Sequence, residues 1–238
     1  MKKLIIAFVV LCTYSQAQQL SVENKPVMNE DGKMVDSWVA HLDQDQSYCM
    51  NTYNEFMRKN FDYRTGRRAK NILSVDKKTF AEISSLRIDQ RAIFWPESNG
   101  TAVAFQFSPG YDIHFGNEMY KEEFNRAEAL VKNYVRFHYK YFYEEKKKEL
   151  NSKIKSRQKS ISNNETRIKK NEKTIADNNE DIAANSIDAD KLRDKNTKLE
   201  NENNSLHSEI DKLNAEISNL EGEISKADES LKNAEAFN

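Results

Sequence analysis

The second half of the chain carries a seven-residue repeat of apolar and asparagine side chains, and this repeat limits what the segment can fold into. One series of positions seven residues apart runs from Ile154 to Leu231, and a second runs from Leu150 to Ala234. The two series are offset by three and four residues, so they are the a and d positions of one heptad register. About twelve heptads follow without interruption, several times the three or four that indicate a coiled coil. The sequence therefore predicts a long α-helical coiled coil.

The side chains on these two series form a predicted oligomerisation seam. Buried asparagine in such a seam reduces stability and is tolerated where it determines register or oligomeric state. We therefore expect a homo-oligomer or an envelope protein as partner. The seam residues are Ile154, Ile161, Asn164, Ile168, Asn171, Ile175, Asn178, Ile182, Asn185, Leu192, Leu199, Leu206, Ile210, Leu213, Ile217, Leu220, Ile224 and Leu231.

Within residues 161–185, four consecutive heptads read Ile-x-x-Asn, with isoleucine at a and asparagine at d. This run resembles the polar layers in the stalks of trimeric autotransporter adhesins, where asparagines at d can enclose an anion on the three-fold axis. The resemblance covers this motif alone and implies a trimer, which we prefer to a parallel dimer. The threonine that often follows the asparagine in those stalks is replaced here by Glu165, Glu172, Asn179 and Ser186.

A helical hairpin within one chain satisfies the same heptad register. A turn in residues 185–190 would place Asn178 opposite Asn196 and Asn171 opposite Asn203, so that polar layers meet across an antiparallel seam. Neither glycine nor proline marks such a turn, which argues against the hairpin. The register itself leaves trimer, dimer and hairpin open.

Composition separates this repeat from the rest of the chain. Beyond Tyr143 the only aromatic residue is Phe237, and isolated Ile and Leu residues alternate with Asn, Ser, Lys and Glu. Such a stretch cannot build a globular core. We therefore predict a folded head at residues 18–146 and a coiled-coil stalk at 147–238.

The first residues have the pattern of a secretory signal peptide. Positive charges at residues 2–3 precede an apolar run over 4–12, and small residues lead up to a cleavage site after Ala17. The run is too short to span a bilayer, which needs about 20 residues. Leu11 before Cys12 argues against a lipoprotein. We predict a signal peptide at residues 1–17, export to the periplasm or cell surface of a bacterium, and no transmembrane segment in the mature chain.

The head is expected to be an α+β fold with β-α-β-β-β-α order, in which an antiparallel sheet carries its helices on one face. Alternating apolar residues predict the strands, and apolar residues at three- and four-residue spacing predict the helices. An Asp43–Gln46 capping box is expected to open the first helix. The predicted strands are 34–42, 69–75, 92–95 and 101–108, and the predicted helices are 44–60 and one that starts near residue 118.

Six aromatic residues gather where the head meets the predicted stalk. One interpretation is a helix that is buried on several sides. The other is an interaction surface for a peptide, a glycan or a membrane interface, because tyrosine combines an apolar ring with a polar tip. The residues of this possible interaction surface are Tyr134, Phe137, Tyr139, Tyr141, Phe142 and Tyr143.

Candidate catalytic and metal-binding residues are few. His41 with Asp43, and His114 with Asp112, could form a metal or acid–base cluster only if the fold brought them together, because a metal needs three or four converging ligands. Cys49 is expected to be a packed thiol, with a reactive thiol or an intermolecular disulfide as alternatives. A small basic patch could bind anions or protect a strand edge. Its residues are Arg64, Arg67, Arg68 and Lys70.

Charge and motifs together limit the function classes. Lys+Arg (37) and Asp+Glu (38) nearly cancel, which argues against nucleic acid as a partner. No catalytic motif is present, so we predict no catalytic residue, no cofactor and no metal. The sequence favours an exported, non-catalytic structural or interaction protein of the bacterial envelope, whose long coiled coil oligomerises and presents small heads. The alternatives are a periplasmic chaperone-like holdase with helical-hairpin tentacles, or a ligand-binding or enzymatic head on an assembly stalk.

Overall fold

The computed structural model describes residues 20–184 and 187–237, and these residues form two compact units. The first unit, called the head, contains the described residues up to His138 together with Phe237. The second, called the two-helix unit, runs from Tyr139 to Ala236. The predicted signal peptide, residues 1–17, lies outside the described residues.

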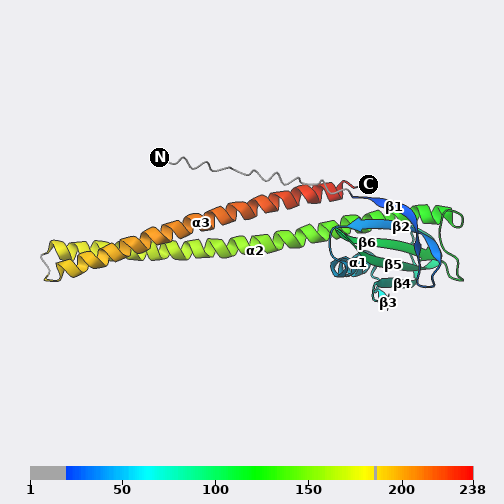
Figure 1. Cartoon of the computed structure of the whole chain (residues 1–238), viewed down its shortest axis with the longest axis horizontal. Coiled ribbons are helices and arrows are strands. Elements are labelled where there is room, and N and C mark those ends of the chain that lie inside the picture. The colour runs from blue at the N-terminus through cyan, green and yellow to red at the C-terminus, as the bar shows by residue number, and fades with distance from the viewer. Residues whose placement is uncertain (1–19, 185–186, 238) are drawn as a thin grey trace, which may run out of the picture. The chain divides into compact units, whose positions relative to one another are not determined.

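The head is built on a six-stranded antiparallel sheet with strand order β1-β2-β6-β5-β4-β3 (Figure 1). The fold class predicted from the sequence is therefore confirmed in outline: an α+β head followed by long helices. The strands are β1 (Val22–Met28), β2 (Met34–Leu42), β3 (Gly66–Ala69), β4 (Ile72–Thr79), β5 (Arg87–Glu97) and β6 (Gly100–Ser108).

The predicted β-α-β-β-β-α order is wrong at two places, because β1 and β3 add a strand each. Both are edge strands of the sheet. In β1, Pro26 lies among charged side chains, and the four residues of β3 are all exposed. Edge strands with charges or proline carry little of the buried alternation that marks a strand in a sequence. The position of β1 and β3 at the edges of the sheet therefore explains why their sequences lack the apolar alternation that predicts a strand.

Helix α1 (Gln46–Phe61) begins two residues later than predicted. The cap expected from the sequence is Asp43, but the Asp45 carboxylate accepts the backbone N–H of Tyr48 at 2.9 Å, while Asp45 itself is extended. Asp62 ends the helix in a left-handed conformation, with φ of 56°. The cap moves because a side chain can satisfy the first-turn N–H groups only from the residue directly before the helix.

Helix α2 (Lys121–Ala183) also begins later than predicted, and helix α3 (Ala189–Glu235) follows it. Before α2, the backbone N–H of Asn117 donates to the Asp36 carboxylate at 2.8 Å, which holds this segment on β2 as a loop. In the described part of the chain, no helix combines the length and the hydropathy required to cross a membrane.

Both α1 and the first part of α2 pack on one face of the sheet, called the helix face. The Tyr53 ring of α1 lies 5.9 Å from Phe105 of β6 and 5.6 Å from Tyr134 of α2, and all three are fully buried. The Trp38 indole N–H of β2 donates to the carbonyl of Phe124 at 2.8 Å. Side chains alternate along a strand, so the residues between these ones point to the other side of the sheet, called the opposite face.

Candidate functional site

The opposite face of the sheet has an apolar floor of small and β-branched side chains. Partly buried Val27 and Trp95 pack against this floor. The floor is a separate hydrophobic cluster on the face of the sheet opposite α1 and α2, so side chains pack together on both faces of the sheet. The floor residues are Val39, Ile72, Ile93, Ala102 and Ala104.

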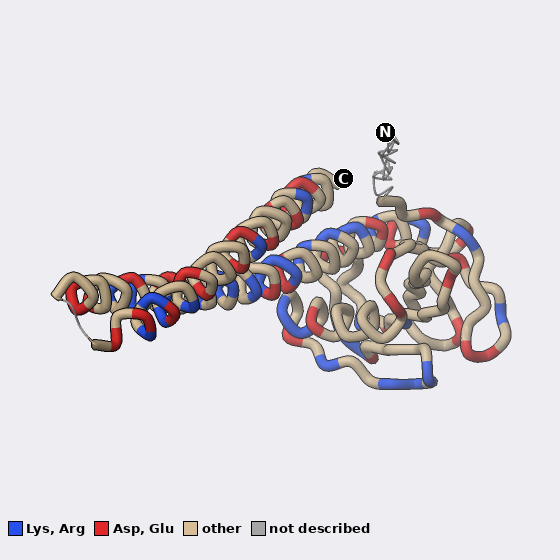
Figure 2. Tube along the Cα trace, turned by 60° about the vertical axis from the view of Figure 1, so that its left-hand side comes forward, with Lys and Arg blue, Asp and Glu red and all other residues tan. Residues whose placement is uncertain are grey.

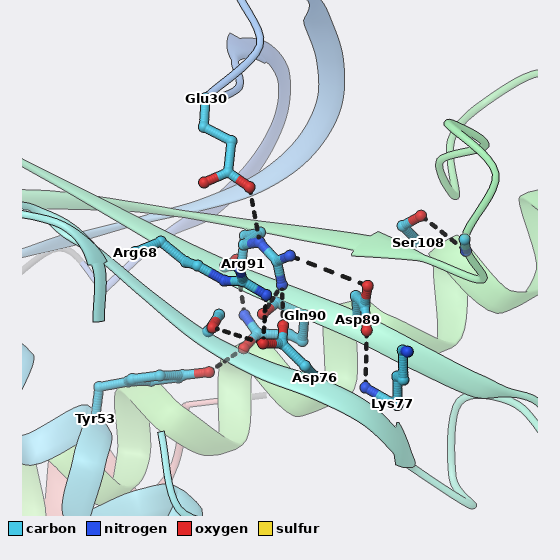
Figure 3. A network of polar contacts seen from close by, with 11 residues as sticks. Glu30, Tyr53, Arg68, Asp76, Lys77, Asp89, Gln90, Arg91 and Ser108 are labelled. Carbon is cyan, nitrogen blue, oxygen red and sulfur yellow. Dashed lines mark hydrogen bonds and ion pairs between the residues drawn. The ribbon is translucent and has the colours of Figure 1, made fainter. Parts of the chain in front are cut away.

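Arg91 of β5 lies at one end of this face and is surrounded by carboxylates (Figure 3). Its guanidinium is 2.6 Å from Asp76, 3.4 Å from Glu30 and 4.0 Å from Asp89, and the side chain is only 18% exposed. Arg68 pairs with Asp76 from the neighbouring strand at 2.6 Å. The positive charge of Arg91 is thus already compensated by acidic groups from three segments of the chain.

Beside Arg91 lies a cavity of about 180 Å³. Ile72, Ile93 and Gln106 line it from the strands, and two loops at residues 29–31 and 110–114 complete its wall. Four carboxylates and one guanidinium are among the lining groups, so the cavity carries a net negative charge. These charged residues are Glu30, Asp31, Asp89, Asp112 and Arg91.

His114 also lines the cavity, and its place near Asp112 in the sequence is the only signal that points to it. Its Nδ1 is buried and has no hydrogen-bond partner among the described residues. Burial lowers the pKa of His114 below its ordinary value, against the opposing effect of the Asp112 charge. The ring is therefore neutral at pH 7, with one nitrogen available as an acceptor.

His41 belongs to a different cluster at the other end of the same face. Its Nδ1 is 2.8 Å from Glu97, and its Nε2 is 3.1 Å from Glu23. Partial burial opposes protonation, but the hydrogen bonds with Glu97 and Glu23 raise the pKa of His41 above its ordinary value. The possible His41–His114 site is therefore not assembled, and the described residues contain no cluster of three or more His, Cys, Asp or Glu side chains suited to hold a metal.

Cys49 is a buried free thiol on α1, as expected for a packed side chain. Its Sγ lies 3.5 Å from the carbonyl of Gln44, and burial raises its pKa to about 12. The fully buried His138 ring of α2 contacts Thr52 Oγ1 at 2.6 Å and Gln44 Oε1 at 2.5 Å. Burial lowers the pKa of His138 to about 3, so the ring stays neutral and holds α2 on α1.

The predicted basic patch falls at the β3 edge of the sheet. Arg67 donates to the carbonyls of Ala69 and Lys70, and Arg68 pairs with Asp76. This position fits a charged strand edge that resists pairing with other chains. Anion binding by the patch stays a prediction.

In the two-helix unit, asparagines of α2 and α3 pair across the seam. Asn171 Nδ2 donates to Asn203 Oδ1 at 2.9 Å, and Asn178 Nδ2 donates to Asn196 Oδ1 at 2.6 Å. Asn196 in turn donates to Asn179 at 2.8 Å. These are the pairs that the hairpin alternative predicts, and they lie within one chain.

Ion pairs give the same antiparallel direction. Lys147 pairs with Asp228, Arg157 contacts Glu216 at 2.6 Å, and Arg167 contacts Glu202 at 2.7 Å. Partner numbers fall along α3 as they rise along α2, which is the pattern of antiparallel helices. Figure 2 shows basic and acidic residues interspersed along both helices. Exposed pairs of this kind add little stability, so they define register more than they hold the helices together.

Every described seam residue from Ile154 to Leu231 is buried or half-buried, whereas most of its neighbours are exposed. Asn185 lies outside the described residues. Asn164 is 7% exposed, and its Nδ2 has no partner among the described residues. The heptad pattern thus identifies the inner face of both helices, while the predicted trimer and dimer stay predictions.

The six aromatics of the possible interaction surface separate into two groups. Tyr134 and Tyr139 are 0% and 1% exposed, so they cannot form a surface in this fold. Tyr134 is buried because it contacts Phe105 of the sheet and rings of α1. The other members are half-buried, and they are Phe137, Tyr141, Phe142 and Tyr143.

Sequence reasoning did not find the cavity, and Arg91 carried no recognisable signal. Its partners Asp76 and Glu30 come from another strand and from a loop, so no spacing in the sequence connects them with Arg91. Comparisons with protein-family models, curated proteins and solved structures found no match to this chain. A function for this chain therefore has to be inferred from the geometry of its own residues.

Proposed function

We propose that this chain is a non-catalytic structural or interaction protein of a bacterial envelope. In this proposal residues 1–17 direct export, the head binds a partner, and the seam residues pair α2 with α3 in an intramolecular antiparallel coiled coil. The observation that carries it is the direct pairing of Asn171 with Asn203 and of Asn178 with Asn196. At about 1.5 Å per residue, the 47 residues of α3 make a rod of about 70 Å.

The pairing favours an intramolecular arrangement over the parallel trimer or dimer. In a parallel assembly each asparagine would face its own copies, and the 178–196 and 171–203 contacts could not form. Because α2 and α3 pair within one chain, their pairing does not depend on protein concentration, which suits a spacer that acts as a monomer. Oligomerisation through other surfaces stays compatible with this proposal.

A pair of engineered cysteines tests the arrangement in the full chain. Asn178→Cys combined with Asn196→Cys is expected to give an oxidised monomer that runs faster on a non-reducing gel and loses both new thiols. The matched control is Asn178→Cys alone, which should stay monomeric. A covalent dimer of that single variant would support the parallel assembly instead. Light scattering on the unmodified chain should give a mass near 27.7 kDa, less any cleaved signal peptide.

Export is tested separately with a reporter fusion. Residues 1–17 fused to alkaline phosphatase, which needs an oxidising compartment to form its disulfides, should give an active enzyme. Replacement of Lys2 and Lys3 by glutamate should reduce that activity. An inactive fusion with the unmodified residues 1–17 would refute the proposed export to the bacterial envelope.

The holdase alternative receives less support from the exposed side chains. A client-gripping tentacle needs exposed apolar surface. Among the described residues, Ile187, between α2 and α3, is the only large exposed hydrophobic residue of the two-helix unit. The ligand-binding alternative is favoured by a specific observation, the cavity beside Arg91 on the opposite face of the head.

A further inference from the structure

The cavity beside Arg91 has features that select a class of ligand. Its apolar wall is made by Ile72 and Ile93, which are 8% and 7% exposed, and its polar wall is dominated by carboxylates. A ligand that fills it must place an apolar part against the isoleucines and a polar part against the acidic groups. Binding pockets commonly combine an apolar wall with a few convergent polar groups.

An anionic ligand does not suit this cavity. Among the described residues Arg91 is the only guanidinium in its lining, and it already pairs with Asp76 and Glu30 and approaches Asp89. An added anion would have to displace one of these carboxylates and would face other acidic groups of the lining as well. Like charges at such short range oppose binding.

A cation meets the opposite situation. When ionised, the Asp31 and Glu30 carboxylates accept hydrogen bonds and donate none. The Asp31 carboxylate has no ion-pair partner among the described residues, and Asp112 has only a long contact of 3.4 Å with the exposed Lys33. His114 adds a buried Nδ1 that has no partner in the described part of the chain. The Asp31 and Asp112 carboxylates therefore leave hydrogen-bond acceptors unused around the cavity.

The loops that carry these acceptors are held in place by their own hydrogen bonds. Asn29 Oδ1 accepts the backbone N–H groups of Asp31 at 3.0 Å and Lys33 at 2.8 Å. Ser108 Oγ donates to the Ile113 carbonyl at 2.6 Å and accepts the Gly110 N–H at 3.0 Å. Preorganised loops lower the entropy lost when a ligand binds.

We propose that this cavity binds an ammonium or guanidinium group carried on an apolar stem, the chemistry of a lysine or arginine side chain or of an alkyl amine. The stem lies against Ile72 and Ile93, and the charged end reaches Asp31 and Asp112, beside the neutral His114 ring. The inference deepens the proposed function, because it rests on the head as a binding unit and names the chemistry of its partner. Long basic side chains commonly bury their stems in this way and keep the charge in polar surroundings.

Titration followed by backbone amide NMR of the full chain tests the proposal. N-acetyl-arginine methylamide should give saturable shifts at residues 29–33, 89–93 and 106–114, with a dissociation constant on the order of 1–10 mM. The neutral isostere N-acetyl-citrulline methylamide should give none. Putrescine serves as the free amine, so tighter binding of the arginine probe indicates a peptide source and tighter binding of putrescine indicates a small-molecule source.

Two variants connect the shifts to the named groups. Asp31→Asn with Asp112→Asn should weaken binding of the arginine probe about fivefold, because two ion pairs to the probe are lost at exposed side chains. Glu82→Gln removes one exposed charge outside the cavity lining and should leave the affinity unchanged.

Any one of the following results would overturn the proposal: no saturable shift with either cation, equal shifts with the citrulline probe, or saturable binding of inorganic phosphate in place of arginine. Unchanged affinity in the double Asp variant would do the same. Because the cysteine cross-link between residues 178 and 196 reports on the two-helix unit alone, a failure here leaves that part of the proposed function standing.

Discussion

The asparagine pair between α2 and α3 allows a direct test of how the helices are arranged. Asn178 and Asn196 are 6% and 7% exposed, and they are 18 residues apart in the chain. Replacing Asn178 by leucine leaves Asn196 Oδ1 buried without its donor, and replacing Asn196 leaves Asn178 Nδ2 buried without its acceptor. Each single change should therefore destabilise the pair by about 1–2 kcal/mol.

The double variant should behave differently. Asn178→Leu with Asn196→Leu removes both polar groups at once, so its stability should equal or exceed that of the unmodified chain. The interaction energy of the double-mutant cycle is then about 2–4 kcal/mol, the sum of the two single losses. Native-state hydrogen exchange of the amides in residues 175–182 and 192–199 measures it in the full chain, because it reports local opening energies.

A parallel assembly gives the opposite signs. The two positions would then lie about 27 Å apart along the axis, their effects would add within about 0.5 kcal/mol, and each single leucine would stabilise its own layer. Asn178→Leu with the exposed Asn204→Leu is the matched control, which should be additive in either arrangement. Additive, stabilising single changes at 178 and 196 would refute the antiparallel seam.

Three further predictions concern the head. His138 has a pKa of about 3 in the folded chain, below its unfolded value near 6.5, so its contribution to stability is complete above pH 6.5 and falls by about 2 kcal/mol at pH 5. Urea unfolding at both pH values should show this loss, and His138→Gln should remove it; an unchanged loss would contradict a buried neutral ring. The thiol of Cys49 should resist iodoacetamide at pH 8 until urea unfolds the chain, as mass spectrometry can show, and rapid native labelling would mean that the helix face opens. Tyr53→Phe removes the buried hydrogen bond to Gln90 and should lower the free energy of unfolding by about 1–2 kcal/mol, whereas Tyr111→Phe, at a 97% exposed position, should change nothing.

Several elements of the head could be predicted because their side chains are buried in a regular pattern. The strands at 34–42 and 101–108 alternate between two covered faces, and α1 carries its apolar residues at helical spacing. The edge strands β1 and β3 could not be predicted, because their charged and exposed residues obscure any alternation of apolar and polar side chains. The cavity escaped for a different reason: its wall joins residues from two loops and three strands, and only the sheet register brings them together.

Heptad spacing was enough to identify which residues of α2 and α3 face inward, because a period of 3.5 residues places a and d on one stripe of a helix whatever that stripe contacts. The heptad pattern does not determine which surface this stripe packs against, because the same a and d residues can face another copy of the chain or a later part of the same chain. This point required the folded chain, in which α2 ends at Ala183 and α3 starts at Ala189, so that Asn178 meets Asn196. The charged surroundings of the head cavity could also be found only from the folded structure, because Asp76, Glu30 and Asp89 converge on Arg91 only when the sheet has formed.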